Sequence, residues 1–265
     1  MIVRDNDEPL DIRGVPTGLP ADASLRRLPL ACGEQLLVLI IPLRDDDEGT
    51  SPPDPARITE IVTAWVAATD RQAATPTSVV TVPLYGCHVV WTPGRAAVVG
   101  PSARLEQLAT AVSDFASREG ELRQLEQRCA DLVAAVEGDA AHAFEVDEHA
   151  VSQRDALAVR FREAVAVRGR LAMLAPAVHA PPLHPPTLAS QLGERLRDRT
   201  RLAERHDFAV DRAELAERLY EACGQRVSEF GIARRQLALE WAIVVLLVIQ
   251  TALLVVDLLA GRGTT

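Results

Sequence analysis

One apolar stretch late in the sequence constrains this chain more than any other feature. Residues 241–256 read WAIVVLLVIQTALLVV, which carry no charge and include only two polar residues, Gln250 and Thr251. Extended to 237–259, the stretch would form a helix of about 34 Å, enough to cross a hydrocarbon core of roughly 30 Å. Apolar residues surround the whole helix, without the polar stripe of a soluble amphipathic helix. We therefore predict one transmembrane helix at 237–259, followed by a short tail at 260–265.

The residues around this stretch predict which side of the membrane holds the rest of the chain. Arg226, Arg234 and Arg235 precede the stretch, and Arg262 follows it. Arginines concentrate on the cytoplasmic side of a membrane span. The first residues are polar and acidic, without the apolar core of a signal peptide. We expect a tail-anchored, single-pass protein of the cell membrane, with its N-terminal bulk in the cytoplasm and the lipid bilayer as a partner.

Three residues of the predicted anchor carry specific expectations. Glu240 lies near one end, where it can reach headgroup water, and Trp241 occupies the place of an interfacial aromatic residue. Gln250 lies near the middle, and an amide in hydrocarbon tends to find a partner on another helix. The sequence thus predicts self-association through Gln250, with a lone tolerated glutamine as the alternative.

The composition limits the classes of function. A net charge of −9 argues against general nucleic-acid binding, which needs a basic face. Hydrophobic residues make up 48% of the chain but aromatic residues only 4%, which favours helices packed through small side chains. The sequence contains no lysine, a bias typical of a GC-rich bacterial genome. Its four widely spaced cysteines form no CxxC pair and are expected to be reduced and mostly buried.

The first hundred residues predict a small α/β domain. Residues 1–34 are rich in proline and glycine and are expected to form an extended arm. Residues 35–100 then alternate between strand-like and helix-like patterns. The predicted elements are a strand at 36–43, a helix at 56–72, and strands at 78–83, 87–92 and 96–99. The fold class is therefore α+β, with about four strands and a helix in this domain.

Residues 101–236 predict a helical region that links this domain to the anchor. Apolar residues recur there at alternating spacings of three and four, the pattern of a narrow coiled-coil seam. The seam residues chosen for helix packing are Leu122, Leu125, Cys129 and Leu132. This pattern fits either one long helix or a hairpin with partner helices. Further helices are expected at 148–174, 187–206 and 213–230, with an extended connector of five prolines at 176–186. The last of these helices either ends before the anchor or runs on into it.

Candidate chemistry is sparse. His142, Glu145 and His149 form the densest ionisable cluster, and the last two are four residues apart, which suits a metal on one helix face. Their spacing matches neither HExxH nor a repeated ExxH pair. No GxSxG, Walker or GxGxxG motif occurs. We therefore predict no catalytic residue, no cofactor and no enzyme activity, and keep a metal-dependent enzyme as an alternative.

Two patches of the sequence resemble a known family. Leu239, Glu240 and Trp241 open the apolar span, and residues 85–91 read YGCHVVW. Both patches resemble signatures of the Rmd1/RMND1-like family, also called DUF155. The resemblance implies a membrane-anchored, oligomerising protein without enzymatic activity.

A second resemblance rests on overall layout. Some accessory proteins of actinobacterial conflict systems, encoded beside caspase-like peptidases and TPR proteins, also join a small α/β domain to a helical region. That accessory role is kept as an alternative function. The leading prediction is a non-enzymatic scaffold or interaction module at the cytoplasmic face of a membrane. Its expected partners are the bilayer, a second copy of the chain and a protein of unknown identity.

Overall fold

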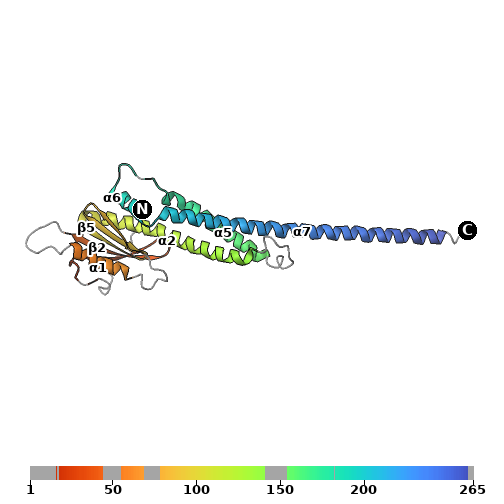
Figure 1. Ribbon diagram of the computed structural model, residues 1–265, viewed down its shortest axis with the longest axis horizontal. Helices are drawn as coiled ribbons and strands as arrows, with labels where there is room; N and C mark the ends of the chain where they lie inside the picture. The colour runs from red at the N-terminus through yellow and green to blue at the C-terminus, as the bar shows by residue number, and fades with distance from the viewer. Residues whose placement is uncertain are drawn as a thin grey trace, which may run out of the picture. The chain divides into compact units, whose positions relative to one another are not determined.

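A computed structural model describes residues 16, 18–43, 55–68, 78–140, 154–181 and 183–261. It confirms the α+β class, with a mixed five-stranded sheet followed by helices (Figure 1). The chain divides into two compact units. Met1–Arg128 and Gly169–Asp211 form the first, here called the sheet unit, and Cys129–Arg168 and Arg212–Thr265 form the second, the helical unit. Each unit is described by itself.

The sheet has the strand order β1-β2-β5-β4-β3. Strands β2 and β5 pair in parallel, because the chain crosses over through helix α1 after β2. The other three pairs of neighbouring strands are antiparallel. The elements are β1 (Ser24–Pro29), β2 (Gln35–Leu43), α1 (Pro55–Ala67), β3 (Val80–Leu84), β4 (Cys87–Thr92) and β5 (Arg95–Pro101). The predicted meander of three strands is confirmed.

Turn chemistry explains why the meander closes where it does. Tyr85 and Gly86 both have positive φ, which is the two-residue hairpin turn that matches the twist of β3 and β4. Gly94, at φ 86°, turns the chain between β4 and β5 after Pro93. Pro42 is tolerated in β2 because it lies beyond the last residue that pairs with β1, Ile40.

Strand β1 corrects the prediction of an extended arm over residues 1–34. Ser24–Pro29 pairs antiparallel with β2 and forms an edge of the sheet. Its pattern is exposed at four of six positions, eieeie, and it carries Arg26 and Arg27. The conformation of such a polar edge strand comes from pairing with its neighbour, so its own sequence gives only a weak strand signal.

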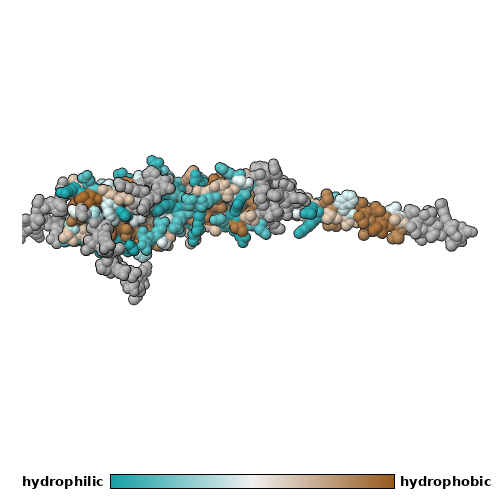
Figure 2. All heavy atoms as spheres, turned by 90° about the horizontal axis from the view of Figure 1, so that it is seen from below, coloured by the Kyte–Doolittle hydropathy of each residue, from teal (hydrophilic) through white to brown (hydrophobic). Residues whose placement is uncertain are grey.

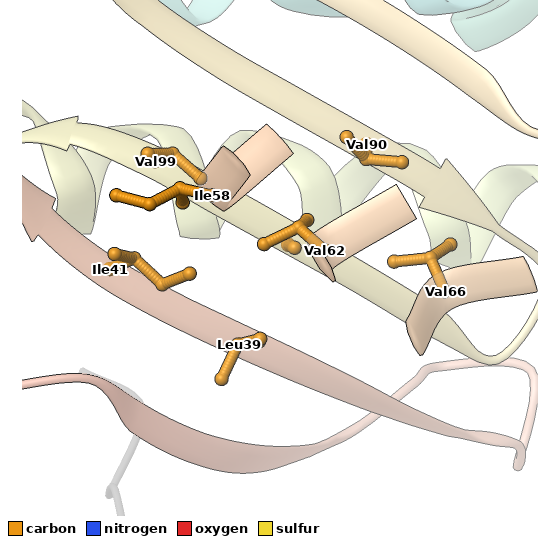
Figure 3. Packing of buried hydrophobic residues seen from close by; sticks show 8 residues of the cluster. Leu39, Ile41, Ile58, Val62, Val66, Val90 and Val99 are labelled. Atoms are coloured by element: carbon orange, nitrogen blue, oxygen red, sulfur yellow. The ribbon is translucent and has the colours of Figure 1, made fainter. Parts of the chain in front are cut away.

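Each face of the sheet is covered by a helix. On one face α1 places Ile58, Val62 and Val66 over apolar residues of β2, β4 and β5, as Figure 3 shows. On the other face lies α2 (Ser102–Asp139), whose Phe115 meets the ring of Trp91 edge-on at 5.0 Å. The alternation of β4 sends Val90 to the first face and Trp91 to the second. The sheet therefore has buried apolar residues on both of its faces.

Four helices are described in the predicted helical region and the anchor that follows it, and several boundaries differ from expectation. They are α2, α5 (Arg154–Val178), α6 (Leu188–Arg199) and α7 (Leu202–Gly261). Gly120 does not interrupt α2, so this segment forms one long helix and not a hairpin. Helix α5 runs through Pro176, which lacks the backbone N–H that would bond the carbonyl of Ala172 one turn earlier. The proline connector thus begins at His179 instead of residue 176.

Helix α7 is longer than predicted. The expected break between helices at 187–206 and 213–230 is absent, and α7 is continuous from Leu202 to Gly261. The shorter helix α6 precedes it, started by a capping box in which Thr187 and Ser190 satisfy each other's backbone N–H groups. The predicted membrane segment at 237–259 therefore lies within one uninterrupted helix.

Candidate functional site

The apolar end of α7 is the most unusual surface in the described chain. Its window of highest hydropathy has none of its residues buried against other parts of the protein. Figure 2 shows this segment as brown spheres that run up to the grey end of the helix. The exposed large apolar residues are Leu237, Leu239, Trp241, Ile243, Val244, Val245, Leu246, Leu247, Val248, Ile249 and Leu253.

This exposure is compatible with a membrane-spanning helix. A core helix passes the same test of length and hydropathy, but most of its window is buried, whereas here the buried share is 0%. Among the described residues, α7 is the one helix long and apolar enough to cross a membrane. The structure therefore provides a candidate membrane-spanning helix where the sequence predicted one.

The three anchor residues lie on exposed positions of this helix. Trp241 is 64% exposed, and Glu240 accepts a bond of 3.5 Å from the amide of Gln236, one turn earlier. Thr251 satisfies its hydroxyl internally by donating to the Leu247 carbonyl at 2.8 Å. Gln250 is exposed, and its amide forms no hydrogen bond with any described residue. Its polar group is therefore open to a partner outside the chain.

The seam residues of α2 are placed differently from the anchor. Leu122, Leu125, Cys129 and Leu132 are all at most 4% exposed. The face marked by this spacing is therefore buried. That face is already covered within a single chain, so it offers no surface to a second copy. The predicted coiled coil with a partner remains without support from these residues.

A partly buried ion-pair network connects α2 to α7 within the sheet unit. The guanidinium of Arg205 bonds both carboxylate oxygens of Glu126, at 2.9 and 2.6 Å, and reaches Glu119 at 3.3 Å. Glu119 is 2% exposed and is also paired with Arg123 at 2.6 Å. Every charge in this cluster has an opposite partner, which is the condition for burying it. These ion pairs therefore act to hold α2 and α7 together.

A second polar cluster lies in the helical unit around Asp139. Its carboxylate accepts hydrogen bonds from Arg160 and from the Tyr220 hydroxyl, the latter at 3.1 Å. The bond to Asp139 holds the pKa of the Arg160 guanidinium above its ordinary value. Burial, and then the neighbouring Asp139 carboxylate, raise the pKa of Tyr220 to about 12, so the phenol stays protonated. This cluster also joins helices.

A third cluster, in the sheet unit, brings two histidines and an aspartate together. His179 follows the last turn of α5, whereas His206 and Asp207 lie on α7. The ring nitrogens and carboxylate oxygen of this trio all lie within 4.8 Å of one another. His206 is buried at 3% exposure, and its Nε2 lies 2.9 Å from the Leu171 carbonyl. His179 and Asp207 are exposed, so solvent reaches one side of the cluster.

The sequence did not anticipate this cluster. It placed metal-binding potential at His142, Glu145 and His149, which lie outside the described residues. His179 falls within the predicted proline connector at 176–186, and no sequence motif singled out His206 or Asp207. No local motif could have found them, because the connector and α6 separate His179 from the other two in the chain.

The comparisons with known proteins add no relative. The Rmd1/RMND1-like resemblance therefore rests on Leu239, Glu240, Trp241 and residues 85–91 and stays a prediction. No protein-family model matches this sequence, and no curated protein is significantly similar to it.

Proposed function

We propose that this chain is a single-pass membrane protein that uses residues 237–259 of α7 as its anchor. The observation that carries the proposal is the complete exposure of the apolar segment along a continuous helix. A large apolar side chain left in water forgoes about 1.5–3 kcal/mol of burial free energy. Eleven such side chains are exposed between Leu237 and Leu253. A hydrocarbon phase covers all sides of a helix at once, as this pattern requires.

The charges around the segment favour one orientation. Arg226, Arg234 and Arg235 are all in the exposed part of α7 that precedes it. Arginines this close to a span are retained on the cytoplasmic side. The orientation that follows places the sheet unit in the cytoplasm.

The proposed work of the protein is to hold an interaction module at the membrane. Confinement to a surface raises the effective concentration of a partner without any new contact. The clusters around Glu119 and Asp139 support this reading, since both act to brace helices against one another. A non-enzymatic scaffold is therefore the function we infer.

Fractionation of two proteins tests the anchor. The full chain is compared with a truncation ending at Arg235, which keeps every residue described as buried, the last of which is Cys223. We expect the full chain to pellet with bacterial membranes and resist carbonate, and the truncation to remain soluble. Protease added to spheroplasts should leave the full chain intact. A carbonate-soluble full chain, or digestion of the sheet unit from outside, would contradict the anchor or its orientation respectively.

Self-association is the second part of the proposal, and Gln250 is its basis. An interhelical hydrogen bond in a membrane contributes about 0.6–2 kcal/mol, so Gln250→Leu should weaken association roughly 3- to 30-fold. The neighbouring Thr251→Val is the matched control, because that hydroxyl already bonds the Leu247 carbonyl. Energy transfer between copies with N-terminal fluorophores, diluted in lipid vesicles, measures the change. Equal dissociation constants for Gln250→Leu and the unaltered chain would remove the amide from the interface.

A further inference from the structure

The cluster of His179, His206 and Asp207 has the dimensions of a metal site. The His179 Nε2 lies 3.4 Å from the His206 Nδ1 and 3.2 Å from the Asp207 Oδ1. The third side of the triangle, from His206 Nδ1 to Asp207 Oδ1, is 3.4 Å. Three potential ligand atoms therefore form a nearly equilateral triangle.

These side lengths match the edge of a tetrahedron around zinc. Zinc–nitrogen and zinc–oxygen bonds of roughly 2.0–2.1 Å at tetrahedral angles put neighbouring ligand atoms about 3.3 Å apart. Direct hydrogen bonds between such groups are shorter, with a most frequent N···O distance of about 2.9–3.0 Å. All three sides are longer than that value and close to the tetrahedral edge. The triangle thus fits a shared cation better than a set of mutual hydrogen bonds.

A backbone contact fixes His206 in the form that a metal needs. Its Nε2 lies 2.9 Å from the Leu171 carbonyl oxygen, which can only accept a hydrogen, so Nε2 carries the proton. In the neutral ring Nδ1 then presents its lone pair to the triangle. Ligand histidines are typically oriented by such a bond from their second nitrogen. Because His206 is buried at 3% exposure, this orientation is held by packing as well.

The other two groups complete a site with an open side. His179 is held in place by its own N–H, which bonds the Ala175 carbonyl at 2.9 Å, and by Arg197, which bonds the next carbonyl, Ala180, at 3.4 Å. Asp207 supplies a negative charge. The side chains of His179 and Asp207 are 42% and 65% exposed, so a fourth ligand can enter from water. Three protein ligands and one open position is a coordination that zinc adopts.

We propose that His179, His206 and Asp207 bind one divalent transition metal ion, with zinc as the preferred ion. Two imidazoles and one carboxylate suit zinc in both ligand type and geometry. The ion would join the residue after α5 to the first part of α7, within the sheet unit. This site is independent of the membrane anchor and uses none of the residues His142, Glu145 and His149.

Zinc titration of the full chain tests the site. The protein is purified in mild detergent without a histidine tag, stripped with a chelator, and titrated with Zn²⁺ by calorimetry. Metal content after desalting gives the stoichiometry. We expect one zinc per chain, and a Co²⁺ adduct with the strong visible absorption of tetrahedral cobalt. His179→Ala and Asp207→Asn should each weaken zinc binding roughly 10-fold or more.

The choice of variants separates binding from folding. His179 and Asp207 are exposed, so their substitution leaves the core intact, whereas His206 is buried and its loss would disturb packing. His184→Ala is the matched control, since His184 is an exposed histidine of the same connector and lies outside the triangle. It should leave the affinity unchanged. The proposal is overturned if zinc does not bind stoichiometrically, or if His179→Ala and Asp207→Asn bind it as tightly as the control.

Discussion

Arginines in place of Val245 and Val248 together are expected to release the full chain from membranes into the soluble fraction. Both valines lie near the centre of the proposed span and are exposed at 53% and 64%. About a dozen apolar residues favour insertion by roughly 0.3–0.6 kcal/mol each, or about 4–7 kcal/mol in all. Two central arginines oppose it by about 6–8 kcal/mol relative to the valines they replace. The balance for insertion therefore changes sign, and carbonate extraction measures the result.

The matched control is the pair Val245→Leu and Val248→Leu, which keeps the helix apolar and should remain in the membrane pellet. Neither substitution touches the packed core, because none of this window is buried. Circular dichroism should thus show the same folded helices and sheet in both variants. If the arginine variant still resists carbonate, another part of the chain holds the protein in the membrane.

The sheet shows how far local sequence patterns reach. The segments that became β2, β3, β4 and β5 were predicted because their apolar runs and turn residues are local signals. Strand β1 was missed because its residues 24–29, SLRRLP, carry only two leucines among arginines. Its strand conformation comes from pairing with β2, where Leu25 meets Leu39 across the edge. Pairing at a sheet edge depends on tertiary structure, so the strand propensities of the residues do not predict it.

The seam of α2 shows a different limit. Leu122, Leu125, Cys129 and Leu132 were predicted as a helix-packing seam, and all four are buried. A spacing of three and four residues says which face of a helix is covered, but not what covers it. Here the covering is intramolecular, supported by bonds such as those of Arg205 to Glu119 and Glu126. The pattern alone could not choose between these helices and a second copy.

Local sequence patterns could not have predicted the histidine cluster. His179 and His206 meet only because the chain returns through α6 and starts α7 beside the end of α5. A metal site on one helix leaves a spacing of three or four residues in the sequence, such as that between Glu145 and His149. Ligands from two helices leave no such trace. The apolar segment of α7 could be predicted for the opposite reason, since one continuous stretch of sequence carries the whole signal.

Trp91→Ala is expected to have the largest effect on the stability of the sheet unit. Trp91 is 2% exposed and meets Phe115 of α2 edge-on, with ring planes at 78°. Its loss removes the largest buried side chain on this face of the sheet and leaves a cavity, which typically costs about 3–5 kcal/mol. At about 2–4 °C per kcal/mol for a protein of this size, the Tm should fall by roughly 6–20 °C. Thermal unfolding of the full chain in detergent, followed by far-ultraviolet circular dichroism, measures the shift.

Trp91→Phe separates the packing of the ring from its polar group. The indole Nε1 is buried and has no hydrogen-bond partner among the described residues, so replacing the indole by a phenyl ring sacrifices no hydrogen bond. An unsatisfied buried N–H itself costs about 1–3 kcal/mol, and its removal offsets part of the lost apolar contact. We therefore expect Trp91→Phe to lower the Tm by only a few degrees, far less than Trp91→Ala. Equal shifts for the two variants would mean that the indole N–H has a partner and that the edge-on contact with Phe115 contributes little to the packing of α2 on the sheet.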